Sequence, residues 1–294
     1  MIEPLWDEIA ARLSGELRVR RRFEAAHPIS GGDTASAYRL IVSGESYFVK
    51  LGHAGDQMMF AAEAEGLAAI GATHAIRCPK PLLHGIAQER AFLVLEHIPL
   101  SPHGDESTLG EALAQLHRCI GTHYGWHRDN TLGRTPQDNR VDHNWIRFWR
   151  ERRLEPQLRM AEEHAAPTAL IVAGERLLAR LPALLDGHSP APSLLHGDLW
   201  CGNYAYDSEG QPVLYDPAPY YGDRETDLAM TMLFGGFGAT FRAAYHTAWP
   251  LPSGYEHRQA LYNFYHVLNH FNLFGGGYAR QAIQMIERLV SDVD

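Results

Sequence analysis

The feature that most constrains the fold is a short β-hairpin pattern inside an otherwise helical part of the chain. Residues 202–206 and 212–216 read as two strands, and the stretch 207–210, Asp-Ser-Glu-Gly, reads as the turn between them. Helical periodicity is found on both sides of this hairpin. The helical stretches cover residues 106–120, 143–163, 168–185, 256–272 and 278–290. We therefore predict a mainly helical domain with one inserted hairpin.

The first third of the chain has a different pattern, in which short apolar strands dominate. The stretch 28–33 is rich in turn-forming residues, and Gly71 marks the end of a helix. The expected elements are a helix at 5–14, strands at 37–42 and 47–51, a helix at 57–70, and strands at 82–86 and 91–96. Pro99 and Pro102 then separate these elements from the helical part. The sequence therefore predicts an α+β fold of two lobes, a small β-rich lobe at 1–97 and a larger, mainly helical lobe at 98–294.

The charge of the chain argues against two classes of partner. The 294 residues include 26 Lys and Arg against 35 Asp and Glu, which gives a formal net charge of −9. The most basic stretch, 18–22, is interrupted by Val19, so no long basic run is present. Nucleic acid and anionic membranes bind to such basic runs. We therefore expect neither of them as a partner.

The cysteines and the N-terminal sequence indicate a cytoplasmic protein. There are three cysteines, an odd number, and none are in a CxxC arrangement, so a disulfide framework is not expected. The N-terminal residues include acids where a signal peptide would be basic and apolar, and no uncharged run reaches membrane-spanning length. The 17 histidines include no HExxH motif and no zinc quartet.

Three polar residues around the hairpin suit phosphoryl transfer. Residues 196–203 read His-Gly-Asp-Leu-Trp-Cys-Gly-Asn, which places Asp198 five residues before Asn203, the spacing of a kinase catalytic loop. Asp198 would orient an acceptor hydroxyl and accept its proton. Asn203 and Asp216, at the two ends of the hairpin, offer oxygen ligands to Mg²⁺. Each residue alone is compatible with ordinary turn chemistry, but their joint order and spacing favour a catalytic site.

A lysine and a glutamate in the first lobe give an independent indication. On the helix 57–70, Glu63 shares a face with Phe60 and Leu67. A carboxylate on a packed face needs a cation nearby, and Lys50, which closes the strand 47–51, is the candidate. Lys50 would also reach the phosphates of ATP. A single lysine on a strand is more often exposed to solvent, so this prediction depends on Lys50 occurring together with Glu63 and the downstream loop.

Two further segments of the first lobe are candidates for contact with ATP. Small residues before the first long strand would let backbone N–H groups approach phosphates. The segment between the last strand and the helices would be a hinge whose backbone meets adenine. The residues are Ser30, Gly31 and Gly32 in the first segment and Glu96, His97 and Ile98 in the second. Both signals are weak when taken alone, because the first segment lacks a full GxGxxG and a plain surface turn explains it equally well.

Three longer motifs carry a resemblance to a known family. They lie at 196–203, at 216–231, which begins Asp-Pro-Ala-Pro-Tyr-Tyr-Gly-Asp, and at 233–237, Leu-Phe-Gly-Gly-Phe. Supporting stretches lie at 30–33, 59–67, 124–127 and 135–137, so that the resemblance extends over nearly the whole chain. In these residues the chain resembles the fructosamine kinase, or ketosamine-3-kinase, family. Its wider relatives are the aminoglycoside and choline kinases, which share the protein-kinase-like fold.

The resemblance implies a function and a set of roles. It implies a cytoplasmic enzyme that uses Mg²⁺ and ATP to phosphorylate the third-carbon hydroxyl of a ketoamine, so that the glycated amine is recovered. Asp198 would be the base, Asn203 and Asp216 the metal ligands, and Lys50 and Glu63 the phosphate pair. The resemblance also implies that Asp227, on the helix that follows, holds the catalytic loop in place.

The position of the acceptor and the role of one cysteine are less defined by the sequence. Trp200, Trp126 and His127 could form a platform for the sugar and for a protonated amine, or could simply pack the lobe. Cys201 stands where many relatives have a small hydroxyl residue, and a thiol beside the site is open to oxidation.

Three other readings stay open at this stage. The chain could phosphorylate another alcohol, such as an aminoglycoside, a choline-like amine or another metabolite. It could be a catalytically inactive nucleotide-binding module, although all five polar positions are intact. Hydrolase chemistry would need further metal ligands or a GxSxG elbow, which the sequence lacks. The amine, the sugar and the oligomeric state are left undecided by the sequence.

Overall fold

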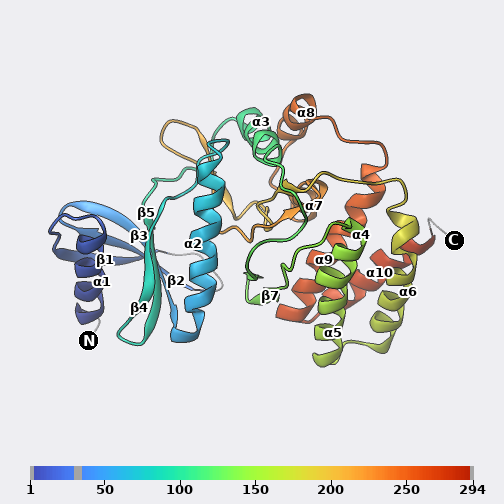
Figure 1. Ribbon diagram of the computed structural model, residues 1–294, viewed down its shortest axis with the longest axis horizontal. Helices are drawn as coiled ribbons and strands as arrows, with labels where there is room; N and C mark the ends of the chain where they lie inside the picture. The colour runs from blue at the N-terminus through green and yellow to red at the C-terminus, as the bar shows by residue number, and fades with distance from the viewer. Residues whose placement is uncertain (1–2, 30–34, 292–294) are drawn as a thin grey trace. The chain divides into compact units, whose positions relative to one another are not determined.

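The computed structural model describes residues 3–29 and 35–291. The chain forms two compact units, each of which contains two segments of the sequence. The first unit consists of residues 1–105 and 204–217, and the second of residues 106–203 and 218–294. The first unit is built on an antiparallel sheet and the second is mainly helical (Figure 1).

The sheet of the first unit has five strands in the order β1-β2-β3-β5-β4, and every neighbouring pair is antiparallel. The strands are β1 (Phe23–Ile29), β2 (Ser36–Val42), β3 (Glu45–His53), β4 (Pro81–Ala87) and β5 (Arg90–Glu96). The four strands predicted from the sequence are all present. Strand β1 was not predicted, because most of its residues are at least partly exposed and it lacks the alternating apolar pattern of a half-buried strand.

Two helices cover the opposite faces of this sheet, α1 (Glu3–Glu16) and α2 (Gln57–Ala72) (Figure 1). Alternate residues of a strand point to opposite faces, so each strand divides its side chains between the two helices. On β5, Phe92 and Val94 pack in the cluster with α1, whereas Leu93 and its alternate neighbours pack with α2. On β3, Val49 belongs to the α1 cluster. The next residue, Lys50, therefore faces α2.

A second hairpin belongs to the first unit although it lies more than a hundred residues further along the chain. Its strands are β9 (Tyr204–Tyr206) and β10 (Pro212–Leu214), close to the strands predicted from the sequence. Backbone hydrogen bonds join Tyr206 to Ser101, and Asp207 accepts a hydrogen bond from Arg77. This grouping differs from the predicted lobes, which assigned residues 98–105 and the hairpin to the helical part.

The second unit contains most of the helices. They are α3 (Glu106–His117), α4 (Trp145–Trp149), α5 (Glu155–Glu163), α6 (Thr168–Leu184), α7 (Glu225–Leu233), α8 (Ala239–Ala248), α9 (Tyr255–Phe274) and α10 (Tyr278–Ser291). The short strands β6 (Asn130–Leu132), β7 (Thr135–Gln137), β8 (Ser193–Leu194) and β11 (Tyr221–Gly222) form two small ladders, and a 3₁₀ turn, Ala54–Asp56, precedes α2 in the first unit. Among the described residues, no helix is both long and apolar enough to cross a membrane.

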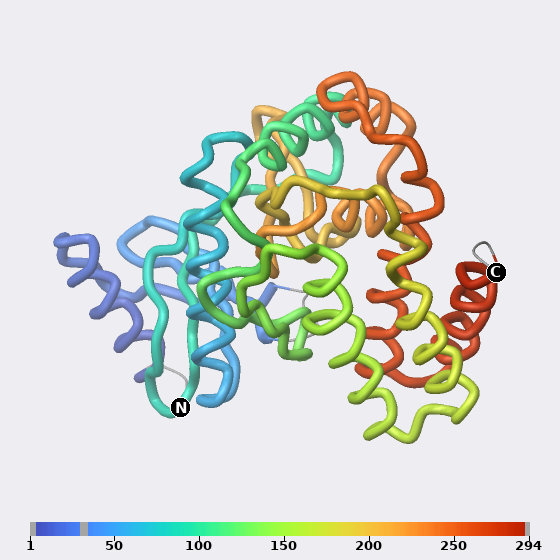
Figure 2. The backbone as a smooth tube through the Cα atoms, turned by 45° about the vertical axis from the view of Figure 1, so that its right-hand side comes forward, coloured from blue at the N-terminus to red at the C-terminus, as the bar shows by residue number. Residues whose placement is uncertain are grey.

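Helix α9 is the centre of the second unit. It packs against α5, α7 and α10 (Figure 2). Most of its residues are buried. Helix α7 is also buried on nearly every side. It therefore lacks the one-sided apolar pattern by which a surface helix is recognised in a sequence. The sequence pattern predicted α9, whereas α7 and α8 were not predicted from periodicity.

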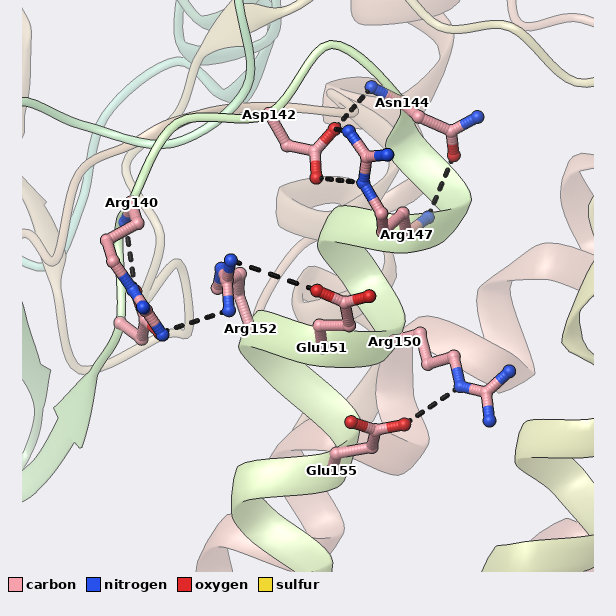
Figure 3. Close-up of polar contacts among 9 residues, drawn as sticks. Arg140, Asp142, Asn144, Arg147, Arg150, Glu151, Arg152 and Glu155 are labelled. Atoms are coloured by element: carbon pink, nitrogen blue, oxygen red, sulfur yellow. Dashed lines mark hydrogen bonds and ion pairs between the residues drawn. The ribbon is translucent and has the colours of Figure 1, made fainter.

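The predicted helix 143–163 is interrupted by one π-helical turn, Arg150–Leu154, between α4 and α5. Ion pairs follow its exposed side, with Arg147 bound to Asp142 at 2.6 Å and Arg150 bound to Glu155 at 2.8 Å (Figure 3). On its inner side Arg153 is fully buried, and its guanidinium lies 4.1 Å from the centre of the Tyr220 ring. Arg153 thus occupies an inward-facing position of the turn that an apolar residue would normally fill.

Candidate active site

The loop that carries Asp198 begins at a short ladder in the second unit. Strand β8 pairs with β11, and the chain then turns at Gly197, which has a φ of 83°. A Cβ atom at this position would lie 2.0 Å from the carbonyl oxygen of Ala218. Because that distance is far below any real contact, glycine is required both by the backbone angle and by the close approach. The sequence His-Gly-Asp is therefore the turn that presents Asp198.

A buried carboxylate holds this loop in place. One oxygen of Asp227, on α7, accepts the backbone N–H of His196 at 2.7 Å, and the other accepts the N–H of Gly197 at 2.9 Å. The ring of His117, on α3, lies 3.1 Å from the same carboxylate. Burial alone would raise the pKa of Asp227, but the hydrogen bond and charge interaction with His117 lower it below its usual value. Asp227 is thus an ionised brace for the loop, the position expected for it from the sequence.

Asp198 and Asn203 are brought together within the loop. The side-chain amide nitrogen of Asn203 donates to the backbone oxygen of Asp198 at 2.8 Å and to its carboxylate at 3.2 Å. Both N–H groups of the amide can be used in this way, so the amide oxygen of Asn203 is the atom suited to a cation. An amide oxygen is a ligand type that Mg²⁺ accepts. The donor set in this loop therefore fits the predicted metal role.

In the first unit, Lys50 lies between two carboxylates. Its ammonium nitrogen is 2.7 Å from Glu63 Oε1 and 2.7 Å from Asp216 Oδ1. Lys50 is on β3 and Glu63 is on the face of α2 that packs on the same side of the sheet. Asp216 follows the hairpin strand β10. The structure thus groups three residues that the sequence predicted for phosphate and metal binding.

The charges of this group are strongly coupled. Burial would lower the pKa of the Lys50 ammonium, but the adjacent Asp216 and Glu63 outweigh burial and raise it, so Lys50 is a permanent cation. Burial raises the pKa of Glu63, and Lys50 opposes that shift. Lys50 is consequently a fixed positive charge that is held in position from two sides.

Asp216 has an unusual backbone conformation. Its φ is 57°, in the left-handed region that residues other than glycine adopt rarely. Such conformations cost about 1–3 kcal/mol and are concentrated at functional sites. The Asp216 side chain is 39% exposed and already has a cation as its neighbour. A carboxylate in this position fits the predicted role in binding Mg²⁺.

The remaining residues predicted for ATP are less informative. Ser30, Gly31 and Gly32 lie outside the described residues. The Glu96 side chain is 3.0 Å from Arg77 and accepts the backbone N–H of Lys80, so its carboxylate has a structural partner. His97 is half-buried and Ile98 is buried. The hinge role of these three residues stays a prediction.

The three residues of the candidate sugar platform come from two segments of the second unit. Trp126 is buried, and its ring packs 5.4 Å from Tyr221 and 4.8 Å from His127. Burial favours the packing interpretation for Trp126, whereas His127 is exposed and contacts only one side of that ring. Trp200 is partly exposed and belongs to the Asp198 loop. Among the three residues, Trp200 is the one that the loop of the candidate base itself carries.

Polar clusters formed by distant residues were not found by sequence reasoning. His117 is one example, because it meets Asp227 across 110 positions of sequence. A second cluster joins His188, Asp223 and Glu225 closely enough to hold a metal ion. However, Arg258 donates two hydrogen bonds to Glu225, and Tyr262 donates one to Asp223. The carboxylates of this cluster are thus already satisfied, and we interpret it as a buried structural ion pair.

Comparison with known families agrees with this geometry. The sequence profile of the fructosamine kinase family matches residues 5–292. The chain belongs to the fructosamine kinase family. It is 44% identical to a protein of Synechocystis sp. that is named a probable ketoamine kinase, over 96% of each chain. It is 39% identical to the chloroplastic protein-ribulosamine 3-kinase of Oryza sativa subsp. indica, over 88% of this chain and 77% of that protein.

Solved structures place this fructosamine kinase family member in a wider fold class. A candidate fructosamine-3-kinase from Haemophilus somnus superposes with a TM-score of 0.90 at 28% identity, over 98% of both chains. The choline kinase LicA of Streptococcus pneumoniae superposes with a TM-score of 0.64 at 14% identity, over 97% of this chain and 98% of that one. The latter likeness shows the fold alone. The predicted α+β, protein-kinase-like fold is confirmed.

Proposed function

We propose that this protein transfers a phosphoryl group from ATP to a sugar hydroxyl of a ketoamine, with the third-carbon hydroxyl as the acceptor. The observation that carries the proposal is the loop at Asp198. A carboxylate is presented there by a glycine turn, hydrogen-bonded to Asn203, and fixed from behind by Asp227. This is the geometry that a group serving an acceptor hydroxyl requires, because proton transfer depends on position before it depends on pKa.

Each residue has a role that follows from its chemistry. We propose Asp198 as the group that orients the hydroxyl and takes its proton as the new bond to phosphorus forms. Lys50 would bind phosphate oxygens, and Glu63 would keep the ammonium in place. Asp216 and Asn203 would hold Mg²⁺, which supplies positive charge to the phosphate oxygens when it is bound. Because the protein forms no covalent bond to the phosphoryl group in this scheme, the rate of transfer would depend on positioning and on charge.

The acceptor class is supported by the family and by the names of its members. The relatives named above are ketoamine and ribulosamine kinases, so a glycated amine is the acceptor we propose for this chain. The sugar and the amine within that class are separate questions. An aminoglycoside or choline-type acceptor is the alternative, because a choline kinase has the same fold.

A reducing compartment such as the cytoplasm fits the state of the cysteines. Cys78, Cys119 and Cys201 are all free thiols in the structure. Free thiols persist where glutathione and thioredoxin keep them reduced. We therefore propose a cytoplasmic location for the protein.

The experiment that tests the function is an ADP-release assay with Mg²⁺ and ATP against four acceptors. These are a fructosyl-amine, a ribulosyl-amine, an aminoglycoside and choline. We expect turnover of the ketoamines alone, and ³¹P NMR of the product should place the phosphate on the third carbon. Turnover of the aminoglycoside or of choline in place of the ketoamines would establish the alternative. Turnover of a ketoamine by Asp198→Asn at the wild-type rate would contradict the assignment of Asp198 as the base.

A further inference from the structure

A continuous series of rings extends from the Asp198 loop in the second unit. Trp200 lies 6.4 Å from Phe234, and Phe234 lies 4.8 Å from His270, measured between ring centres. His270 in turn lies 5.6 Å from Phe274 and 5.3 Å from Tyr278. The five rings come from the catalytic loop, the end of α7, the last turns of α9 and the start of α10. We call them the aromatic track.

The aromatic track is open to solvent at its apolar members. Phe234 is 38% exposed and Phe274 is 60% exposed. Single exposed apolar side chains are common on protein surfaces and need no explanation. Here, however, two exposed phenylalanines contact the same histidine, and the series leads to a residue two positions from the candidate base. An exposed ring series that is continuous with a candidate active site is a candidate binding surface.

Two glycines fix the inner end of the track. A Cβ atom at Gly202 would lie 2.4 Å from the Trp200 ring, so this ring is packed directly on the backbone. Gly236, with a φ of 92°, could not carry a Cβ either, because that atom would lie 2.2 Å from Cβ of Cys201. The turn that follows Phe234 therefore packs against the catalytic loop. Phe234 and Trp200 are held at a defined separation as a result.

His270, in the middle of the track, offers a hydrogen-bond acceptor. Nδ1 of His270 lies 2.8 Å from the backbone oxygen of His266. A carbonyl oxygen only accepts, so Nδ1 must carry the hydrogen, and in the neutral ring Nε2 is then an acceptor. Aromatic faces attract cations, and an acceptor among them suits a protonated N–H group. The chemistry of the track thus matches a cationic secondary amine with an apolar substituent.

We propose that the aromatic track binds the amine-bearing part of the acceptor, namely the amino acid or peptide that carries the sugar. This inference rests on the proposed function and adds a specificity site to it. With the sugar hydroxyl at Asp198, the amine would lie beyond Trp200, near Phe234 and His270, and its substituent would reach Phe274. Ketoamines with a large apolar substituent should accordingly be preferred to those with a small one.

The test compares two ketoamines that have the same sugar, fructosyl-glycine and fructosyl-phenylalanine. We expect the wild type to have the higher kcat/KM for fructosyl-phenylalanine. Phe274→Ala should lower kcat/KM for this acceptor about 3- to 10-fold, the range expected for one aromatic contact. The glycine adduct should change less than about twofold. Phe274→Tyr keeps the ring and should restore the preference, whereas a general loss of structure would not show this pattern.

A matched control variant and the pattern of outcomes distinguish failure of the aromatic-track proposal from failure of the proposed kinase function. Val172→Ala, on α6, removes another exposed apolar side chain and should leave both acceptors unchanged. Equal losses for both adducts in Phe274→Ala, or no loss for either, would overturn the aromatic-track proposal while leaving the kinase function intact. If the wild type phosphorylates neither these adducts nor the ribulosyl adducts of the same two amino acids, the proposed function itself fails. The thermal unfolding midpoint of each variant is measured to confirm that it is folded.

Discussion

At the scale of single residues, Asp198 is the most direct test of the chemistry. Replacing it with asparagine keeps the size of the side chain and removes the group that would take the proton. We expect Asp198→Asn to lower kcat about 10²- to 10⁴-fold, the usual contribution of a general base. The affinity for Mg²⁺ and ATP should stay within about threefold, because the residue is proposed to serve the acceptor. Steady-state kinetics and calorimetric titration with a nonhydrolysable ATP analogue measure the two quantities.

Asp216 should behave in the opposite way, because it is proposed to hold the metal. We expect Asp216→Asn to weaken binding of the Mg²⁺ complex of ATP at least about tenfold, since one carboxylate ligand of a hard cation is removed. Binding of ATP in EDTA should change much less. Asparagine tolerates the left-handed backbone of this position. Asp216→Ala should therefore lose the same affinity and in addition lower the free energy of unfolding by about 1 kcal/mol. Equal losses with and without Mg²⁺ would contradict the metal role.

The residues found from the sequence differ from the residues missed in one respect, which is distance along the chain. Asp198 and Asn203 lie within a single loop, so their spacing alone predicted that they meet, and the structure joins them by two hydrogen bonds. His117 contacts Asp227 across 110 positions, and nothing local in the sequence marks that pairing. Local spacing in the sequence was thus enough to predict the pair Asp198 and Asn203. The supporting contact of His117 could be recognised only in the folded structure.

At the scale of elements, the turn at Gly197 decides where Asp198 is presented. Two costs are combined in a Gly197→Ala variant, the left-handed backbone and a Cβ placed 2.0 Å from the Ala218 oxygen. We expect a loss of about 3 kcal/mol or more in the free energy of unfolding, together with a large loss of kcat. Urea unfolding and steady-state kinetics measure these effects.

Gly187 provides the matched control for this prediction. It has a similar φ, 68°, but a Cβ atom there would meet nothing within 4 Å. Gly187→Ala should therefore cost only the backbone contribution, about 1–2 kcal/mol, and should leave kcat unchanged. If both variants were equally destabilised and equally active, the close approach at Ala218 would not be the constraint that we infer.

The helical face of Glu63, together with the cost of burying a carboxylate without a cation, predicted its contact with Lys50 correctly. Lys50 alternates with Val49 on β3, and Glu63 shares a helical face with Phe60, so both patterns direct their charged residues to the same side of the sheet. The observed separation of 2.7 Å confirms the pairing. The same reasoning failed for β1 and α7. One is largely exposed and the other is buried on nearly all sides, so neither has a contrast between its faces.

At the scale of the whole molecule, the order of the chain did not predict how its parts are grouped. The hairpin was placed with the helical lobe because helices precede and follow it in sequence. In the structure it joins the first unit through the backbone pairing of Tyr206 with Ser101 and through Arg77. Pairings of this kind form between segments that are distant in sequence, and short strands carry little sequence signal for their partners.

The stability of the whole molecule depends on pH, and the buried side chain of His266 contributes to that dependence. Burial lowers the pKa of His266 to about 3, and the nearby His270 adds to the shift while Asp227 opposes it. An unfolded histidine has a pKa of about 6.5. Between these values the unfolded state binds more protons than the folded state. Stability is therefore complete above about pH 6.5 and is lost as the pH falls, by up to about 1.4 kcal/mol per pH unit from this residue.

A His266→Leu variant should remove this contribution and flatten the curve. We expect its free energy of unfolding, measured in urea from pH 7 to pH 4.5, to fall less steeply than that of the wild type. The shift of Glu63 acts in the same range with the opposite sign, but it is present in both proteins and cancels in the comparison. His84→Leu, at an exposed position on β4, is the control and should keep the wild-type slope. Parallel curves for wild type and His266→Leu would mean that His266 takes up its proton in the folded protein, and the interior around α9 would then have to admit a charge.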